Sequence, residues 1–94
     1  MTFEIQYHTD VVRKDIPDLS QTARDQIKQA IEKKLTTSPD QFGKPLRRSL
    51  KGYRRLRIGD YRIIFRIEGN IIKIFIIQHR SVVYKQSKKR LGMK

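Results

Sequence analysis

Arginine, histidine and tyrosine side chains are the groups in this 94-residue sequence whose types and spacing could do chemistry. Arg62 lies in the segment GDYRI, and His79, Arg80 and Tyr84 lie in the segment HRSVVY. Such groups can cleave RNA without a metal, because the 2′-hydroxyl beside each phosphodiester needs only orientation, deprotonation and charge stabilisation. Arginine forks bind phosphate, and nearby positive charge stabilises a tyrosine phenolate as a base. These four residues are the candidate catalytic set.

The pattern leaves the role of each residue open. Arg62 could join Arg57 on the phosphate or be a plain outward charge, and Arg80 could lie near the leaving oxygen. Either Tyr84 or His79 could take the 2′-hydroxyl proton, and a protonated His79 could instead be the acid. His79 could also be a neutral residue bonded to backbone, and Tyr84 could only anchor a last helix.

The element that must position these residues runs from Leu50 to Tyr84. It predicts a three-stranded antiparallel meander with tight turns at Gly59-Asp60 and Gly69-Asn70. Side chains alternate along a strand, so each face of the meander collects one set. The apolar face would hold Leu56, Ile58, Tyr61, Ile63, Phe65, Ile67, Ile72, Ile74 and Ile76. The opposite face would hold Arg55, Arg57, Arg62, Arg66, Lys73 and His79, with Ile64, Phe75 and Ile77 between them.

Like charges face each other across this cationic face. Two-residue loops place Arg57 opposite Arg62 and Arg66 opposite Lys73, and such pairs repel. A face that only needed solvation could alternate Lys and Glu, so the pattern favours a surface built for a polyanion. The predicted RNA- or phosphate-binding residues are Arg54, Arg55, Arg57, Arg66, Lys73, Lys85, Lys88 and Lys89.

Charge is divided unevenly along the chain. Residues 1–43 carry six Lys or Arg and seven Asp or Glu, a net of −1, whereas residues 44–94 carry sixteen against two, a net of +14. This asymmetry points to nucleic acid, an anionic membrane surface or a strongly acidic protein. The basic residues lie mainly on predicted strands and not on an amphipathic helix, which favours nucleic acid.

The remaining sequence predicts a scaffold within one domain spanning residues 1–94. The expected fold class is α+β, in the order β-α-α-β-β-β with an optional last helix, as an antiparallel sheet with two helices packed on one face. A strand is expected around residues 2–8, beside the last meander strand, followed by a short helix that carries Val12 and Ile16 and that Pro17 ends. A longer helix should run from the N-cap Ser20 to about Thr37, before a brief strand around Lys44–Leu46. The basic segment Lys85–Lys94 is either helical or a solvated tail.

Several classes of chemistry are not supported by the composition. There is no cysteine and there are only two histidines, so neither a disulfide nor a metal site is expected, and no cofactor-binding loop is present. The longest apolar run, Ile71–Ile77, contains Lys73 and is too short to span a bilayer, so no membrane partner is expected. A reducing cytoplasm fits the lack of cysteine.

The segments LKGYRRLRIGDYRIIF and HRSVVY, in this order of elements, resemble the RelE/ParE toxin superfamily, and RelE-type mRNA interferases in particular, over nearly the whole chain. The resemblance implies a toxin of a type II toxin–antitoxin pair that cleaves mRNA in the ribosomal A site, leaving a 2′,3′-cyclic phosphate and a 5′-hydroxyl. It also implies an acidic antitoxin partner that covers the cationic face. Two alternatives stay open: a ParE-like inhibitor of DNA gyrase that acts by binding, and a non-catalytic basic RNA-binding module.

The resemblance also assigns roles residue by residue. Arg62 matches the family's phosphate-binding arginine, Tyr84 its C-terminal catalytic tyrosine, and His79 and Arg80 the basic position after the last strand. This sequence departs from the family at two positions that lie before the first turn. There, well-studied members carry lysines where this chain has Arg55 and Arg57, which can clamp phosphate but cannot accept a proton.

Overall fold

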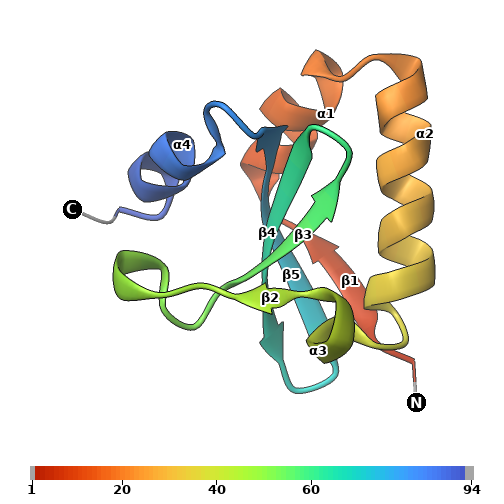
Figure 1. The fold of residues 1–94 in the computed structure, drawn as a ribbon. Coiled ribbons are helices and arrows are strands. Elements are labelled where there is room, and N and C mark those ends of the chain that lie inside the picture. The colour runs from red at the N-terminus through yellow and green to blue at the C-terminus, as the bar shows by residue number, and fades with distance from the viewer. Residues whose placement is uncertain (1, 93–94) are drawn as a thin grey trace.

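A computed structural model describes residues 2–92. Met1, which precedes the expected first strand, and Met93 and Lys94, which belong to the expected basic C-terminal segment, lie outside the described residues. The α+β class is confirmed: five strands form one sheet in the order β1-β5-β4-β3-β2, with helices on both sides (Figure 1). The strands are β1 (Glu4–Tyr7), β2 (Lys44–Pro45), β3 (Arg54–Ile58), β4 (Tyr61–Glu68) and β5 (Ile71–His79). The helices are α1 (Ile16–Asp18), α2 (Gln21–Ala30), α3 (Pro39–Phe42) and α4 (Val83–Arg90), with the shorter or π-type segments η1 (Val11–Asp15), η2 (Ile31–Leu35) and η3 (Arg48–Leu50).

The meander forms with the predicted register at both turns. Arg57 pairs with Arg62 across β3 and β4, and Arg66 pairs with Lys73 across β4 and β5. Gly59 and the other turn glycine have φ angles of 55° and 62°, the left-handed region that a residue with a Cβ atom adopts at a cost. The two turns therefore set the register, as the sequence predicts.

A β-bulge in β5 changes the faces beyond it. Phe65 pairs with Ile74 but Ile64 pairs with Ile76, so Phe75 is an extra residue on β5. Every β5 side chain after a bulge changes face. Ile77 consequently joins the core under α2, and Ile76 joins a second cluster on the other face, so the predicted faces of these two residues are wrong.

The outer strands complete the sheet. β2 pairs antiparallel with β3, where a brief strand is predicted, while β1 lies parallel to β5 on its free side. A parallel neighbour requires a long crossover connection, because its chain must return to the same end of the sheet. The helices between β1 and β2 provide it, so the antiparallel arrangement holds for β2 to β5 only.

The first face of the sheet is covered by α2 and η2. The side chain of Ser20 accepts the Ala23 N–H at 3.1 Å, as an N-cap does. The apolar residues Ala23, Ile27, Ile31 and Leu35 form one buried stripe along α2 and η2. These residues pack on the meander in one core cluster.

The helical segment before α2 carries Val12 and Ile16, as predicted. Its fully buried apolar residue is Val11, whereas Val12 is 54 % exposed. Pro17 lies in the first turn of α1, where a missing N–H is tolerated, and the helix ends at Asp18, one residue after Pro17, with Leu19 as its C-cap. η1 is wound as a π-type segment, and its buried residues are Val11 and Asp15.

The second face of the sheet is covered in part by α4, which confirms a last helix after β5 (Figure 1). Val83 packs with Ile64 and Ile76 in the second apolar cluster, and Leu46 and Tyr53 border it. Within residues 2–92, no helix is long and apolar enough to cross a membrane.

Candidate functional site

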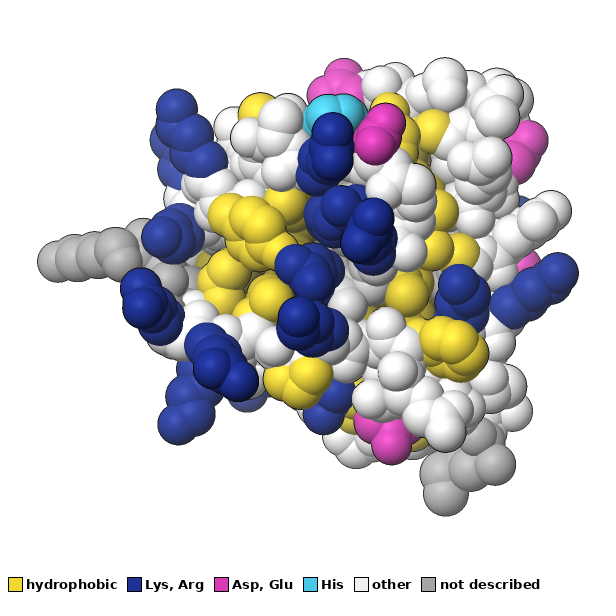
Figure 2. Space-filling model, viewed as in Figure 1, with side chains coloured by type: hydrophobic (Ala, Val, Ile, Leu, Met, Phe, Trp, Pro, Cys, Tyr) yellow, Lys and Arg dark blue, Asp and Glu magenta, His cyan; other side chains and the backbone are white. Residues whose placement is uncertain are grey.

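A cationic surface lies over β3 and around α4. Figure 2 shows a band of Lys and Arg side chains in the middle of the view, over β3, and further ones around an apolar patch between α4 and the loop before β3. Arg57, Arg62 and Gln78 lie in one row across β3, β4 and β5, at the end of the sheet where the Gly59-Asp60 turn lies. We call this end of the second face the basic site.

A contact between Arg55 and Tyr84 joins α4 to the basic site. Arg55 Nη1 donates a hydrogen bond of 2.6 Å to the Tyr84 hydroxyl oxygen, across 29 residues of sequence. Tyr84 is 37 % exposed, so its phenol is reachable from solvent. A charge-assisted hydrogen bond of this length fixes the position of the phenol oxygen relative to the arginine. The contact therefore holds the Tyr84 hydroxyl at the basic site.

The neighbouring arginines differ in how they are held. Arg57 is exposed and lies two residues from Arg55 on the same face, roughly 7 Å further along the strand. Within the described residues, the buried Nε of Arg55 has no hydrogen-bond partner. An unsatisfied donor costs free energy, and such costs are common at functional sites. The guanidinium of Arg57 is thus open to solvent, whereas one donor of Arg55 is buried without a partner.

Arg62 is not the open, outward-facing charge that the strand pattern predicts. Only 9 % of the residue is exposed, and its Nη1 donates to the carbonyl oxygens of Gly59 and Tyr61 at 2.9 Å each. These bonds hold the guanidinium against its own turn. Nε and Nη2 take no part in these two bonds, so Arg62 can still face an anion while it shapes the turn.

His79 lies on the other face from the one predicted, because it follows the bulge. It pairs with Tyr61, and the two rings meet edge to face with centroids 5.9 Å apart. Its Nδ1 lies 2.8 Å from Ser81 Oγ and accepts the Ser81 N–H at 3.2 Å. An Nδ1 that accepts leaves the proton of the neutral ring on Nε2. His79 therefore presents a donor to its surroundings.

Arg80 lies at the same end of the sheet and is exposed. Its backbone N–H donates to the Asp60 carbonyl at 2.8 Å, and its Nε lies 3.8 Å from the Asp60 carboxylate. Both side chains are more than 60 % exposed, so this ion pair adds little stability. Arg80 is therefore held beside the turn by its backbone while its guanidinium can rotate.

Three of the predicted RNA-binding residues lie away from the basic site. Arg54 falls on the first face beside Phe65 and donates to the Gly43 carbonyl at 2.9 Å. Arg66 and Lys73 form ion pairs with Glu68 at 3.6 and 3.2 Å. Arg66 is four residues from Arg62 along β4, about 13 Å. The structure thus keeps Arg55 and Arg57 together with Arg62 and separates the other three from them.

The three predicted RNA-binding lysines lie on α4, and the arginine that follows them has a different environment. Lys85, Lys88 and Lys89 are exposed on α4. Arg90, which the sequence groups with them, points inward: its side chain is only 8 % exposed and forms an ion pair with the buried Asp15 at 2.7 Å. No local pattern predicts this pair, because its members lie 75 residues apart.

The described residues 2–92 contain no group of three His, Asp or Glu that could hold a metal ion. The arrangement itself supplies a tyrosine with a cationic donor, arginines that can bind a phosphate and a histidine that can donate. Together these groups could bind a phosphodiester and move a proton near it.

Comparison with known proteins places the chain among toxins of type II toxin–antitoxin systems. Residues 8–84 match the family model described as the ParE toxin of the type II toxin–antitoxin system parDE. Two curated relatives from Mycobacterium tuberculosis are toxin RelE, 36 % identical over 55 residues, and toxin RelG, 39 % identical over 54 residues. These matches cover 56 % and 55 % of this chain, and 57 % and 62 % of the length of the two relatives.

A solved structure extends the similarity to the fold. The toxin–antitoxin complex RelBE2 from Mycobacterium tuberculosis contains a chain that superposes with a TM-score of 0.79 at 28 % identity. The superposition covers 86 % of this chain and 94 % of that one.

Proposed function

Since the chain belongs to the RelE/ParE superfamily of type II toxins, we propose that it is a ribosome-dependent endoribonuclease that cleaves mRNA in the A site and inhibits translation. The observation that carries the proposal is the hydrogen bond from Arg55 to the Tyr84 hydroxyl, beside the exposed Arg57. A toxin that acted only by binding would not need a tyrosine hydroxyl held by one arginine beside a second, exposed arginine.

The proposed reaction uses groups of this chain and no metal. The 2′-oxygen attacks the adjacent phosphorus, its proton passes to the oxygen of Tyr84 in the phenolate form, and the bond from phosphorus to the 5′-oxygen breaks. Arg57 and the free edge of Arg62 bind the non-bridging phosphate oxygens, whose negative charge grows in the transition state. The leaving 5′-oxygen receives a proton, and the products are a 2′,3′-cyclic phosphate and a 5′-hydroxyl.

The hydrogen bonds favour Tyr84 over His79 as the base. His79 Nδ1 is already an acceptor for Ser81, and its Nε2 carries the remaining proton of the neutral ring. We assign a protonated His79 to the leaving-group side as the acid that gives its proton to the 5′-oxygen, with the exposed guanidinium of Arg80 as a hydrogen-bond donor beside it. Arg55 holds the Tyr84 oxygen, because an arginine stays protonated and cannot itself accept the proton.

The proposed partners are mRNA on the ribosome and an acidic antitoxin. Relatives solved as toxin–antitoxin complexes support a protein partner, and the net charge of +14 in residues 44–94 suits RNA or an acidic protein. Binding of either should weaken as salt rises, because neutralised charges release their counterions. An affinity that stays flat between 50 mM and 200 mM salt would argue against the basic half as the contact surface.

A second candidate is inhibition of DNA gyrase by binding, because the matching family model is that of ParE. Toe-printing of a translated mRNA, run beside a gyrase supercoiling assay with the same purified protein, separates the two. A-site cleavage with normal supercoiling supports the nuclease. Intact mRNA with blocked supercoiling supports the gyrase inhibitor, and binding to RNA with neither effect supports a non-catalytic module.

A further inference from the structure

α4 has little apolar surface to hold it on the sheet. The residues that face inward are Val83, Ser87 and Arg90, spaced i, i+4 and i+7, and only Val83 is apolar. The Ser87 hydroxyl donates a hydrogen bond within the helix, to the Val83 carbonyl at 2.6 Å. A helix of eight residues is unstable by itself in water, so its position depends on tertiary contacts.

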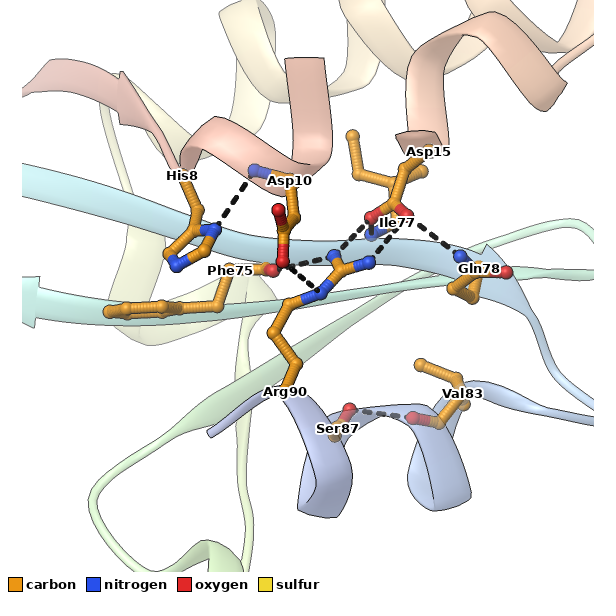
Figure 3. Close-up of polar contacts among 9 residues, drawn as sticks. All are labelled: His8, Asp10, Asp15, Phe75, Ile77, Gln78, Val83, Ser87 and Arg90. Atoms are coloured by element: carbon orange, nitrogen blue, oxygen red, sulfur yellow. Dashed lines mark hydrogen bonds and ion pairs between the residues drawn. The ribbon is translucent and has the colours of Figure 1, made fainter. Parts of the chain in front are cut away.

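The contact at the far end of α4 is a buried, forked ion pair (Figure 3). Arg90 Nη1 and Nη2 donate to the two carboxylate oxygens of Asp15 at 2.7 and 3.0 Å. The Asp15 side chain is fully buried. Arg90 also donates to the Phe75 carbonyl at 3.0 Å, and its Nε lies 3.6 Å from Asp10. A fork that meets two oxygens in one plane fixes orientation as well as distance.

Asp15 connects this ion pair to the strand that carries the basic site. Its Oδ2 accepts the Ile77 N–H at 2.8 Å, and its Oδ1 accepts from Gln78 Nε2 at 2.7 Å. β1 pairs with β5 only as far as Ile74, so the Asp15 carboxylate takes the place of a missing strand neighbour beyond it. Gln78 pairs with Arg62 in the next strand. The Asp15 carboxylate, which lies on η1, thus contacts both β5 and α4.

Building on the proposed function, we infer that Arg90, through Asp15, is a positioning residue for cleavage: it fixes the seating of α4 so that the Tyr84 hydroxyl stays on Arg55. Val83 at one end gives α4 a pivot, and Arg90 at the other end prevents rotation about it. Buried ion pairs add little net stability compared with apolar packing, but they fix geometry. The inference concerns the geometry of Tyr84 and not contact of Arg90 with RNA.

The test compares Arg90→Lys with Arg13→Met, a control that removes an exposed charge from η1. Lysine keeps the charge but cannot form the fork. We expect Arg90→Lys to lower the single-turnover cleavage rate at saturating ribosomes at least 10-fold, with half-saturation changed less than twofold. Combined with Tyr84→Phe, it should add almost nothing, because the residue through which it acts is already disabled. An unchanged rate in Arg90→Lys overturns the inference. So does a double variant whose loss of rate equals the product of the losses of the two single variants.

Hydrogen exchange provides a readout that does not depend on activity. In Arg90→Lys, amides of α4 should exchange at least 10-fold faster while those of α2 keep their rates. Equal acceleration in both helices would mean general loosening and overturn a specific positioning role. If Arg90→Lys does not fold, Asp10→Ala removes the outermost contact and takes its place with the same two readouts. If wild-type protein does not cleave, the proposed function falls, and exchange in α4 alone decides whether the pair seats the helix.

Discussion

The two faces of the sheet carry residues from the same alternating strands but are closed in opposite ways. The first face is covered by α2 and η2, with Ile27, Ile31 and Leu35 at most 3 % exposed. The second is covered by α4, whose only fully buried apolar residue is Val83. Each such side chain contributes about 1.5–3 kcal/mol when buried. The first face therefore holds the fold together, while the second has a lightly held cover and retains exposed cationic groups.

Arginine shows the same contrast within the second face. Arg90 and Arg62 spend donors on the protein itself, on Asp15 and on the turn carbonyls respectively. Arg57 is exposed. An arginine on a strand or helix is thus a binding group or a structural one according to what lies near its guanidinium.

The largest expected effect concerns Tyr84. Tyr84→Phe removes one oxygen and keeps the ring, so cleavage should fall by roughly 10²–10⁴-fold, the usual contribution of a general acid or base, while the melting temperature stays close to that of the wild type. Growth arrest and mRNA cleavage should be measured for Tyr84→Phe and Tyr84→Ala side by side. Full toxicity of the Phe variant would remove the catalytic role and favour action by binding.

The next effect contrasts the two faces in stability. Leu35→Ala should lower the free energy of unfolding by about 2–5 kcal/mol, because it opens a cavity in the first core, yet leave cleavage intact well below its melting temperature. Val83→Ala removes less volume but lies beside Tyr84, so it should cost less stability and more activity. Urea unfolding and cleavage assays on both variants measure whether Leu35→Ala loses more stability and Val83→Ala loses more activity. Parallel losses in the two variants would show that the faces are not separable.

A third comparison separates Arg57 from Arg62. Arg57→Ala should reduce cleavage about 100-fold, as loss of a transition-state donor does, with unchanged stability. Arg62→Ala should reduce cleavage and also lower stability by about 2 kcal/mol, because the turn loses two hydrogen bonds of roughly 1 kcal/mol each. Thermal melts run with the cleavage assay distinguish the two. Equal melting temperatures for both variants would mean that the turn does not depend on Arg62.

The smallest effect is confined to high pH on the first-face side. Burial raises the pKa of Tyr7 above its usual 10.0, and the negative charge of Glu32 adds to the shift. The neutral phenol is therefore favoured in the folded state, so its contribution is fully present below pH 10 and is lost as pH rises through the folded pKa. Tyr7→Phe should flatten the alkaline decline in stability. The effect should be small, since Tyr7 remains 41 % exposed, and an unchanged alkaline slope would exclude it.

The sequence by itself determined those features that local rules fix. The glycine turns set the register of Arg57 with Arg62, the Ser20 cap begins α2, and the apolar stripe of α2 selects its buried face. The alternation of β3 also placed Arg55 and Arg57 on one face, opposite the core. These predictions succeed because each depends on residues within a few positions of one another.

The tertiary structure alone decided what depends on distant partners. The bulge at Phe75 moved His79 to the Tyr61 face, and no glycine or turn residue marks it, because it satisfies packing on both faces of β5 at once. The Arg55 bond to Tyr84 and the Asp15–Arg90 pair join residues 29 and 75 positions apart. The position of an arginine in a basic segment does not show whether it will pair with a buried carboxylate, because only the folded chain brings the two residues together.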